Sequence, residues 1–167
     1  HLILGNDAVG QLNVIDSNNL ESYNKKIESL YDVVNKTSTP MGKRLLKSNL
    51  TNPYSQKNKK KINEKYTMIN ELLKKKFYEK VADELKNIND MERMHRKMAN
   101  GTISPGEFYR LNKYYNSVVK IAELVSTKPT IASLISDETV EKFNKYRKKY
   151  SKDYILDDFP KYGNNHY

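Results

Sequence analysis

The residues best suited to chemistry in this sequence surround its one histidine away from the chain ends. His95 lies between Arg93 and Arg96, and the carboxylates Asp90 and Glu92 precede it. An imidazole beside carboxylates is a typical pattern for acid/base catalysis or metal binding. Asp90 and Glu92, however, are two residues apart, and such residues lie on different faces of a helix. We therefore interpret His95 as a surface residue, Asp90 as a helix-start residue and Glu92 as an ion-pair partner of Arg96.

Common catalytic and nucleotide-binding motifs are missing from the sequence. It contains no G-x-x-x-x-G-K-[ST], G-x-G-x-x-G, H-E-x-x-H or G-x-S-x-G motif, and no EF-hand loop. It also contains no Cys, which excludes a disulfide, a thiolate metal site and a Cys nucleophile. We expect no catalytic, cofactor or metal site in this chain.

The charge of the chain is strongly basic. Its 167 residues include 30 Lys and Arg against 20 Asp and Glu, for a net charge of +10. This favours a polyanionic partner, and basic and aromatic residues alternate near the end of the chain. A solvated helix face has the same composition, so both interpretations stay open. The candidate contacts to DNA phosphates are Lys142, Lys145, Arg147, Lys148 and Lys149.

The chain shows no sign of membrane insertion or export. No apolar run reaches the roughly 18 residues of a membrane span, and the first residues lack the features of a signal peptide. We expect an intracellular protein without a membrane partner, and the absence of Cys suits a reducing compartment.

Helical periodicity dominates the pattern of apolar residues. They recur three and four residues apart, which predicts an all-α multi-helix bundle of six or seven amphipathic helices. One predicted helix starts at Ser17 and runs through Val34, helical spacing continues from Ile62 to Ile88, and the longest stripe covers 108–125. The apolar runs at 2–4 and 12–15 predict a short extended N-terminal segment or loose hairpin.

Helix ends are marked by capping residues. Thr39 is placed as an N-cap before Pro40, Ser104 and Glu107 form a capping-box pattern, and Asn100-Gly101 is typical of a helix end. The helical spacing of Met91, Met94 and Met98 favours a place in the core over a binding surface.

Two blocks resemble a known family. Thr39-Pro40-Met41-Gly42-Lys43-Arg44-Leu45-Leu46, followed by Asn52-Pro53, resembles the block that opens the helical core of MutS-type DNA mismatch repair proteins. Asp90-Met91-Glu92-Arg93 is similar to the D-[LI]-E-R block of the same proteins. Lys65 departs from the family, which commonly has Arg at that place.

The resemblance implies a role without chemistry of its own. The chain is expected to be the core, or lever, that couples an ATPase to binding of mismatched double-stranded DNA. ATP, Mg²⁺ and a homo- or heterodimer of MutS-type subunits are expected of the parent protein. The implied domains are a lead-in at 1–16, the helical core at 17–150 and a polar tail at 151–167 leading toward a clamp. Structural roles are implied for Thr39, Pro40, Gly42, Arg44, Leu45, Leu46, Pro53, Asp90, Glu92 and Arg93.

Other interpretations of the sequence remain open. A free-standing basic helical module that binds nucleic acid is the main alternative, because of the charge and the Lys- and Tyr-rich stretch after Thr139. A scaffold of helices for protein partners is a third. For Arg44 and Arg93, a structural contact to carboxylate or carbonyl groups is favoured over a DNA contact.

Overall fold

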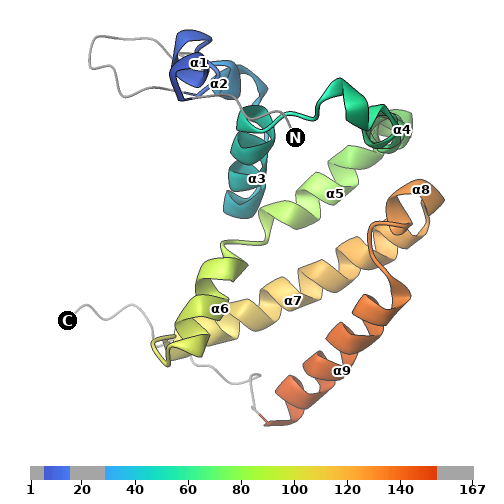
Figure 1. Ribbon diagram of the computed structural model, residues 1–167. Helices are drawn as coiled ribbons and strands as arrows, with labels where there is room; N and C mark the ends of the chain where they lie inside the picture. Colours follow the sequence, from blue (N-terminus) through green and yellow to red (C-terminus); the bar gives the residue numbers. More distant parts are fainter. Residues whose placement is uncertain (1–5, 16–28, 154–167) are drawn as a thin grey trace. The chain divides into compact units, whose positions relative to one another are not determined.

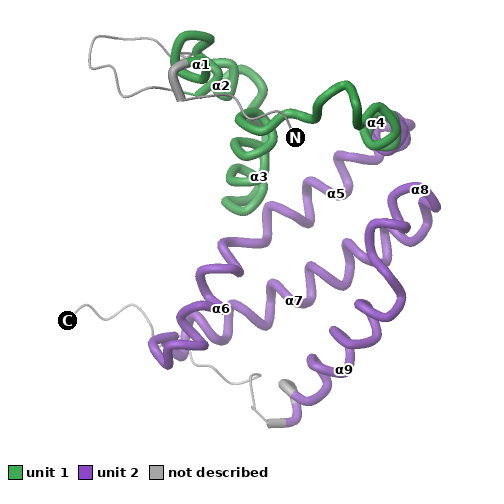
Figure 2. Tube along the Cα trace, in the orientation of Figure 1, with its two compact units in different colours: residues 1–66 green, residues 67–167 purple. Residues whose placement is uncertain are grey.

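The computed structural model describes residues 6–15 and 29–153, and every regular element within these ranges is a helix (Figure 1). The predicted all-α fold is confirmed. The chain divides into two compact units, residues 1–66 and 67–167 (Figure 2). The helices are α1 (Asn6–Gln11), α2 (Leu30–Val34), α3 (Pro40–Thr51), the 3₁₀ turn η1 (Gln56–Asn58), α4 (Lys59–Leu73), the 3₁₀ turn η2 (Lys74–Lys76), α5 (Phe77–Lys86), α6 (Met91–Ala99), α7 (Pro105–Ser126), α8 (Pro129–Ala132) and α9 (Asp137–Asp153).

The first unit starts differently from the prediction. The run at 2–4 lies outside the described residues, but residues 6–11 are helical and a turn follows at 12–13. The carbonyl oxygens of Asn13 and Val14 accept hydrogen bonds of 2.8 and 3.1 Å from the first two amides of α2. The prediction of an extended segment at 12–15 is wrong, because the amides of Leu12, Asn13 and Val14 bond back to carbonyl oxygens of α1 and Asn13 has a φ of 47°.

The helix predicted from Ser17 through Val34 is also wrong at Ser29. Residues 16–28 lie outside the described part, but Ser29 has an extended backbone, with φ −141° and ψ 163°. Its hydroxyl accepts a hydrogen bond from the Asp32 amide, and the Asp32 carboxylate accepts one from the Ser29 amide. This capping box starts a new helix, so the apolar spacing across Ser29 does not reflect a continuous one.

Helix α3 forms as the sequence predicts. The hydroxyl of buried Thr39 accepts a 3.0 Å hydrogen bond from the Gly42 amide, and Pro40 takes the first helical position. Proline suits that position because its missing N–H would have no partner there. The helix ends at Thr51, one residue before the Asn52-Pro53 pair.

A break that the sequence does not reveal separates α4 from α5. Lys75 and Lys76 have φ values of 52° and 55°, in the left-handed region. This conformation costs about 1–2 kcal/mol per residue for side chains other than glycine. Directly after the break, Phe77 is buried and its ring lies 5.2 Å from the ammonium group of Lys128. Packing of α5 in the second unit therefore overrides the continuous helical spacing from Ile62 to Ile88.

The second unit is organised around α7. This helix has 22 residues, which corresponds to a length of about 33 Å. Helices α5, α6 and α8 pack along it (Figure 1). Its start carries the predicted capping box between Ser104 and Glu107. With 22 residues, α7 is the longest of the described helices, and three neighbours pack on it.

The core of this unit lies between α6 and α7. Met94, Leu111 and Tyr115 are buried together, and Leu111 and Tyr115 are only 0% and 1% exposed. Met91 and Met98 pack against this cluster. The prediction that the three methionines belong to the core is confirmed.

The predicted domain boundaries find no direct test in the structure. Helix α9 continues to Asp153, past the predicted core end at 150, and residues 154–167 of the predicted tail lie outside the described part. The boundaries at 16 and 150 stay predictions.

Candidate functional site

The first family block, 39–53, builds one helix start in the first unit. A Cβ atom added to Gly42 would lie 3.1 Å from the Thr39 hydroxyl oxygen and 3.4 Å from the Thr37 Cβ. The helix start therefore depends on Thr39, Pro40 and Gly42 together. The Thr39 hydroxyl oxygen accepts a hydrogen bond from the Gly42 amide, and the missing side chain of Gly42 leaves room for that oxygen. Their roles as start and close-packing residues are consistent with this geometry.

Other residues of this block lie nearer to solvent. Leu46 and Pro53 are half-buried, whereas Leu45 is 63% exposed and Arg44 is exposed. The structural role implied for Leu45 therefore does not come from burial within the first unit. The structural role of Arg44 stays a prediction.

The second block caps a helix in the second unit. Asp90 is the N-cap of α6, and its Oδ1 accepts a 3.1 Å hydrogen bond from the Arg93 amide. Glu92 falls in the first turn, where a carboxylate favours the positive end of the helix dipole. The side chains of Glu92 and Arg93 are exposed. The block therefore marks a helix start through its Asp, as the sequence predicts, and the roles of Glu92 and Arg93 stay predictions.

His95 contacts the core despite its exposed position. Its Nε2 shares a 2.9 Å hydrogen bond with the hydroxyl of buried Tyr115. The Tyr115 ring meets the rings of Phe143 and Tyr146 edge to face, with centroid distances of 5.5 and 5.8 Å. His95 is thus an exposed residue, as expected. It also links α6 to α7 through its hydrogen bond to Tyr115, a contact that the sequence did not predict.

One carboxylate of the second unit has a shifted pKa. The Lys97 ammonium hydrogen-bonds Glu107, the Ser104 amide donates to the same carboxylate, and together they lower the pKa of Glu107 from 4.5 to about 2. The Lys97–Glu107 ion pair connects α6 to the first turn of α7. This arrangement fastens two helices and offers no proton-transfer chemistry near neutral pH.

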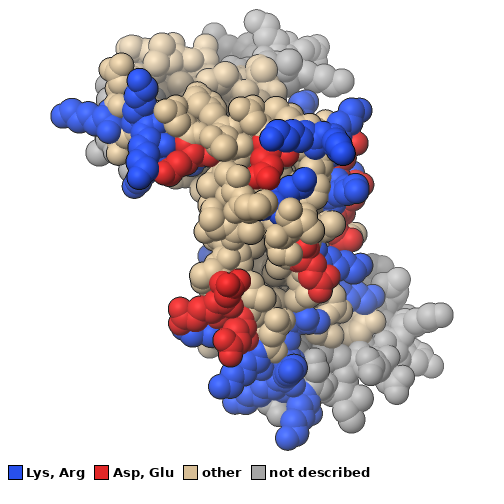
Figure 3. All heavy atoms as spheres, turned by 90° about the vertical axis from the view of Figure 1, so that its right-hand side faces the viewer, with Lys and Arg blue, Asp and Glu red and all other residues tan. Residues whose placement is uncertain are grey.

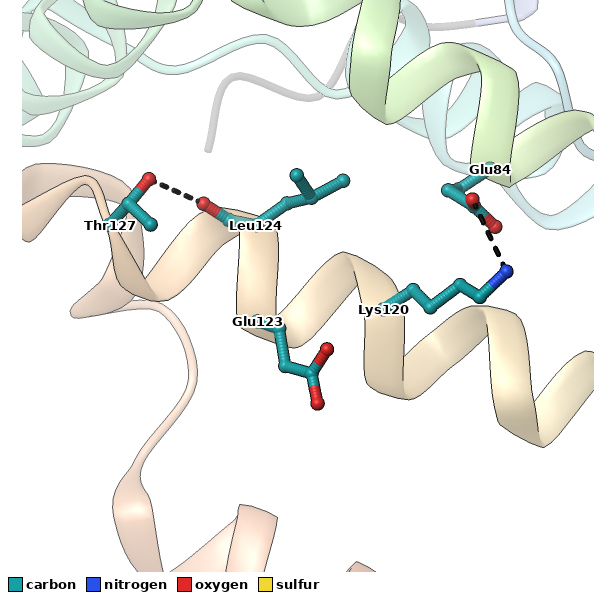
Figure 4. A pocket seen from close by; sticks show the side chains of 5 residues that line it. All are labelled: Glu84, Lys120, Glu123, Leu124 and Thr127. Carbon is teal, nitrogen blue, oxygen red and sulfur yellow. Dashed lines mark hydrogen bonds and ion pairs between the residues drawn. The ribbon is translucent and has the colours of Figure 1, made fainter.

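A groove between α5 and α7 is lined by Glu84, Lys120, Glu123, Leu124 and Thr127 (Figure 4). The Lys120 ammonium lies 3.7 Å from a Glu84 carboxylate oxygen across it, and the Thr127 hydroxyl donates to the Leu124 carbonyl. Within the described residues, no group of three His, Cys, Asp or Glu side chains could hold a metal ion. The groove carries an interhelix ion pair, and we assign no reaction to it.

Helix α9 presents two different faces. Phe143 and Tyr146 contact Tyr115 of α7, and the Arg147 guanidinium donates a hydrogen bond to Asn116 of α7. These residues belong to one face, because positions three and four apart share a side of a helix. The structure therefore places Arg147, a candidate phosphate contact, toward α7.

The opposite face of α9 is a lysine stripe. Lys142, Lys145, Lys148, Lys149 and Lys152 are exposed and follow the spacing of one helix face. In the view of Figure 3, Lys and Arg side chains gather at the lower end of the molecular surface, below a group of Asp and Glu side chains. Lys152 is not among the residues predicted from the sequence, although it lies seven residues after Lys145, a spacing that the helical period reveals.

Comparison with known proteins identifies the family. The model of MutS domain III matches residues 7–164. The chain belongs to the MutS domain III family. The MutS homologue L359 of Acanthamoeba polyphaga mimivirus is 49% identical over 164 residues, which cover 98% of this chain and 15% of that relative. DNA mismatch repair protein MutS of Flavobacterium psychrophilum is 30% identical over 150 residues, covering 87% of this chain and 17% of the relative. The predicted MutS resemblance is confirmed.

The MutS relatives are much longer than this chain, which spans 15% and 17% of their lengths. No solved structure shows a significant match. Within the described residues, no helix is both long and apolar enough to cross a bilayer.

Proposed function

We propose that this chain is the coupling core of a MutS-type mismatch repair protein. In this role, it transmits displacements between an ATPase and a region that binds mismatched double-stranded DNA. The observation that carries the proposal is the match of MutS domain III to residues 7–164, nearly the whole chain. The relatives named as DNA mismatch repair proteins support the DNA partner.

The second unit has the physical properties that coupling requires. A displacement passes between distant sites when the connecting element moves as a rigid body. Helix α7 extends for about 33 Å, is capped at its start and is fastened to α6 by the Lys97–Glu107 ion pair. These contacts support a stiff connecting element.

The chemistry belongs to other parts of the proposed complete protein. We infer that ATP and Mg²⁺ bind outside this chain and that MutS-type subunits pair as homo- or heterodimers. The described residues contribute helix caps, a packed core and ion pairs to this assembly. Their contribution is mechanical stiffness, with no group transfer.

A pair of glycines in α7 tests the proposal. The variant carries Lys113→Gly and Lys120→Gly in a full-length MutS-type protein that contains this chain. Each glycine lowers the stability of the helix by about 1 kcal/mol. Both positions are exposed, so the buried core side chains stay in place. We expect the ratio of ATP hydrolysis rates with mismatched and matched duplex to fall toward one. The matched control, Lys113→Ala with Lys120→Ala, removes the same side chains but preserves helix propensity, and should keep the ratio.

A folded glycine variant with the unchanged ratio would contradict the coupling role. Equal losses in the alanine and glycine variants would also count against it, because the effect would then come from the lysine side chains and their contacts to Tyr109 and Glu84. Circular dichroism of both variants establishes that the helices remain.

A further inference from the structure

We propose that the lysine stripe of α9 binds the phosphate backbone of duplex DNA without reading its sequence. The stripe consists of Lys142, Lys145, Lys148, Lys149 and Lys152. This inference rests on the proposed function in one respect, namely that duplex DNA is the polyanion presented to the chain.

The orientation of the stripe is fixed by the other face of the helix. Phe143 and Tyr146 meet Tyr115 edge to face, and Arg147 is hydrogen-bonded to Asn116. These contacts hold α9 against α7. The lysines on the opposite side therefore point away from α7 as one exposed array, all on the same rigid support.

The dimensions of the stripe suit a nucleic-acid backbone. From Lys142 to Lys152 the helix rises by about 15 Å, and that length of duplex carries about nine phosphate charges. Several lysines can therefore meet phosphates at once. Each such contact releases condensed counterions, which gives binding its dependence on salt.

The helix dipole accounts for only part of the stripe. Favourable interaction of cations with the negative end of a helix falls off within the last turn. Lys152 lies in that turn, whereas Lys142 and Lys145 lie well before it. Within the described residues, Lys142 also has an ion pair with Glu138, so Lys145, Lys148 and Lys149 form the part of the stripe that best suits an external anion.

The composition of the two faces favours DNA over other anionic partners. A helix that binds a membrane surface inserts an apolar face into the lipid, but the aromatic face of α9 packs on Tyr115. Protein interfaces are depleted in Lys and enriched in aromatic residues and Arg. The exposed face of α9 instead carries five Lys and no Arg, against the two carboxylates Glu138 and Glu141 near its start. Because Arg147, the residue best able to read a base edge, is bonded to Asn116, we expect contacts to phosphates only.

The salt dependence of DNA binding tests the stripe. Lys145→Gln, Lys148→Gln and Lys149→Gln together remove three charges at little cost in helix propensity. With the full chain and a fluorescent 30-base-pair duplex, the slope of log binding constant against log salt should become shallower by about 2–3. The loss should be equal for matched and mismatched duplexes, because phosphate contacts carry no direct sequence information.

The matched control removes three positive charges from a helix outside the lysine stripe. Lys59→Gln, Lys60→Gln and Lys61→Gln change three exposed, consecutive residues of α4, which point in different directions. The slope of this control should change by less than about 1. A triple variant that keeps the charge, with Lys145→Arg, Lys148→Arg and Lys149→Arg, should have the same slope as the natural chain. The single variant Lys145→Gln should make the slope shallower by about 0.9. This single variant keeps the test valid if the triple Gln variant loses helical structure.

Three results would overturn the inference. One is an unchanged slope in the single Lys145→Gln variant. Another is an equal change in the α4 control, which would assign binding to net charge. The third is loss of binding to vesicles containing anionic phospholipid without loss of DNA binding. Because these assays measure binding and not ATP hydrolysis, they fail or succeed independently of the ATPase coupling tested by the α7 glycines.

Discussion

Tyr115 provides the most informative perturbation of the second unit, because its ring and its hydroxyl make separable contributions. The residue is 1% exposed, and its ring contacts Phe143 and Tyr146 at 5.5 and 5.8 Å between centroids. Its hydroxyl bonds His95 Nε2 at 2.9 Å and lies 3.5 Å from the Tyr146 hydroxyl. Phenylalanine removes the second set of contacts alone, and alanine removes both.

The two substitutions should differ several-fold in their effect on the free energy of unfolding. In Tyr115→Phe, the exposed His95 and the partly exposed Tyr146 can bond to water instead, so the loss should be about 0.5–1.5 kcal/mol. In Tyr115→Ala, the buried ring leaves a cavity, and the loss should be about 3–5 kcal/mol. That is a large share of the roughly 5–15 kcal/mol that stabilises a typical domain.

Urea unfolding followed by circular dichroism at 222 nm measures both values. Tyr66→Phe and Tyr66→Ala serve as controls, because Tyr66 is 60% exposed and surface changes stay within about 0.5 kcal/mol. A Phe variant as unstable as the Ala variant would refute the reasoning, because the hydroxyl bond to His95 would then outweigh ring burial. A loss below about 1 kcal/mol in Tyr115→Ala would refute the assignment of this ring to the core.

Two further predictions concern helix starts. Gly42→Ala should gain less than the usual stability of about 1 kcal/mol, because the new Cβ would lie 3.1 Å from the Thr39 cap oxygen. In a Thr39→Ala background, Gly42→Ala should gain the usual stability, because the crowding oxygen is gone. Additive effects of the two substitutions in the double-mutant cycle would contradict a close contact between the new Cβ and the Thr39 oxygen. Folding lowers the pKa of Glu107 from the ordinary value of 4.5 to about 2. Its ionised carboxylate therefore stabilises the folded state fully above pH 4.5, and this contribution is lost as the pH falls toward 2. In Glu107→Gln, the melting temperature should change less between pH 4.5 and pH 2 than in the natural chain. Identical profiles of melting temperature against pH for the two proteins would show that the Lys97 contact does not stabilise the folded state.

Helix caps were predictable from sequence because they are local. A hydroxyl or carboxylate three residues before an amide defines a cap without knowledge of the rest of the fold, and Thr39, Asp90 and Ser104 all act in this way. The core position of Met94 also follows from the helical period.

Features set by distant contacts could not be predicted in the same way. The break at Lys75 and Lys76 contains neither glycine nor asparagine, and the burial of Phe77 near Lys128 accompanies it. The carbonyl oxygens of Asn13 and Val14 accept hydrogen bonds from the amides at 30 and 31, and local sequence rules do not reveal a contact between segments this far apart.

The candidate surface was predictable in composition but not in direction. The sequence identified Lys142, Lys145, Lys148 and Lys149, and the structure places these lysines with Lys152 on one exposed face. It could not show that Arg147 bonds to Asn116, because that contact depends on how α9 packs on α7.

The stiffness of α7 during the work of the complete protein is the central claim, and a distance measurement tests it most directly. Spin labels at Arg110→Cys and Ser126→Cys, two exposed positions of α7, should lie about 24 Å apart between backbones. This chain contains no native cysteine that would need to be replaced. In a full-length MutS-type protein carrying the chain, we predict one narrow distance distribution that ATP and mismatched duplex leave unchanged. A second distance, or a marked broadening when ATP and mismatched duplex are added, would contradict the account.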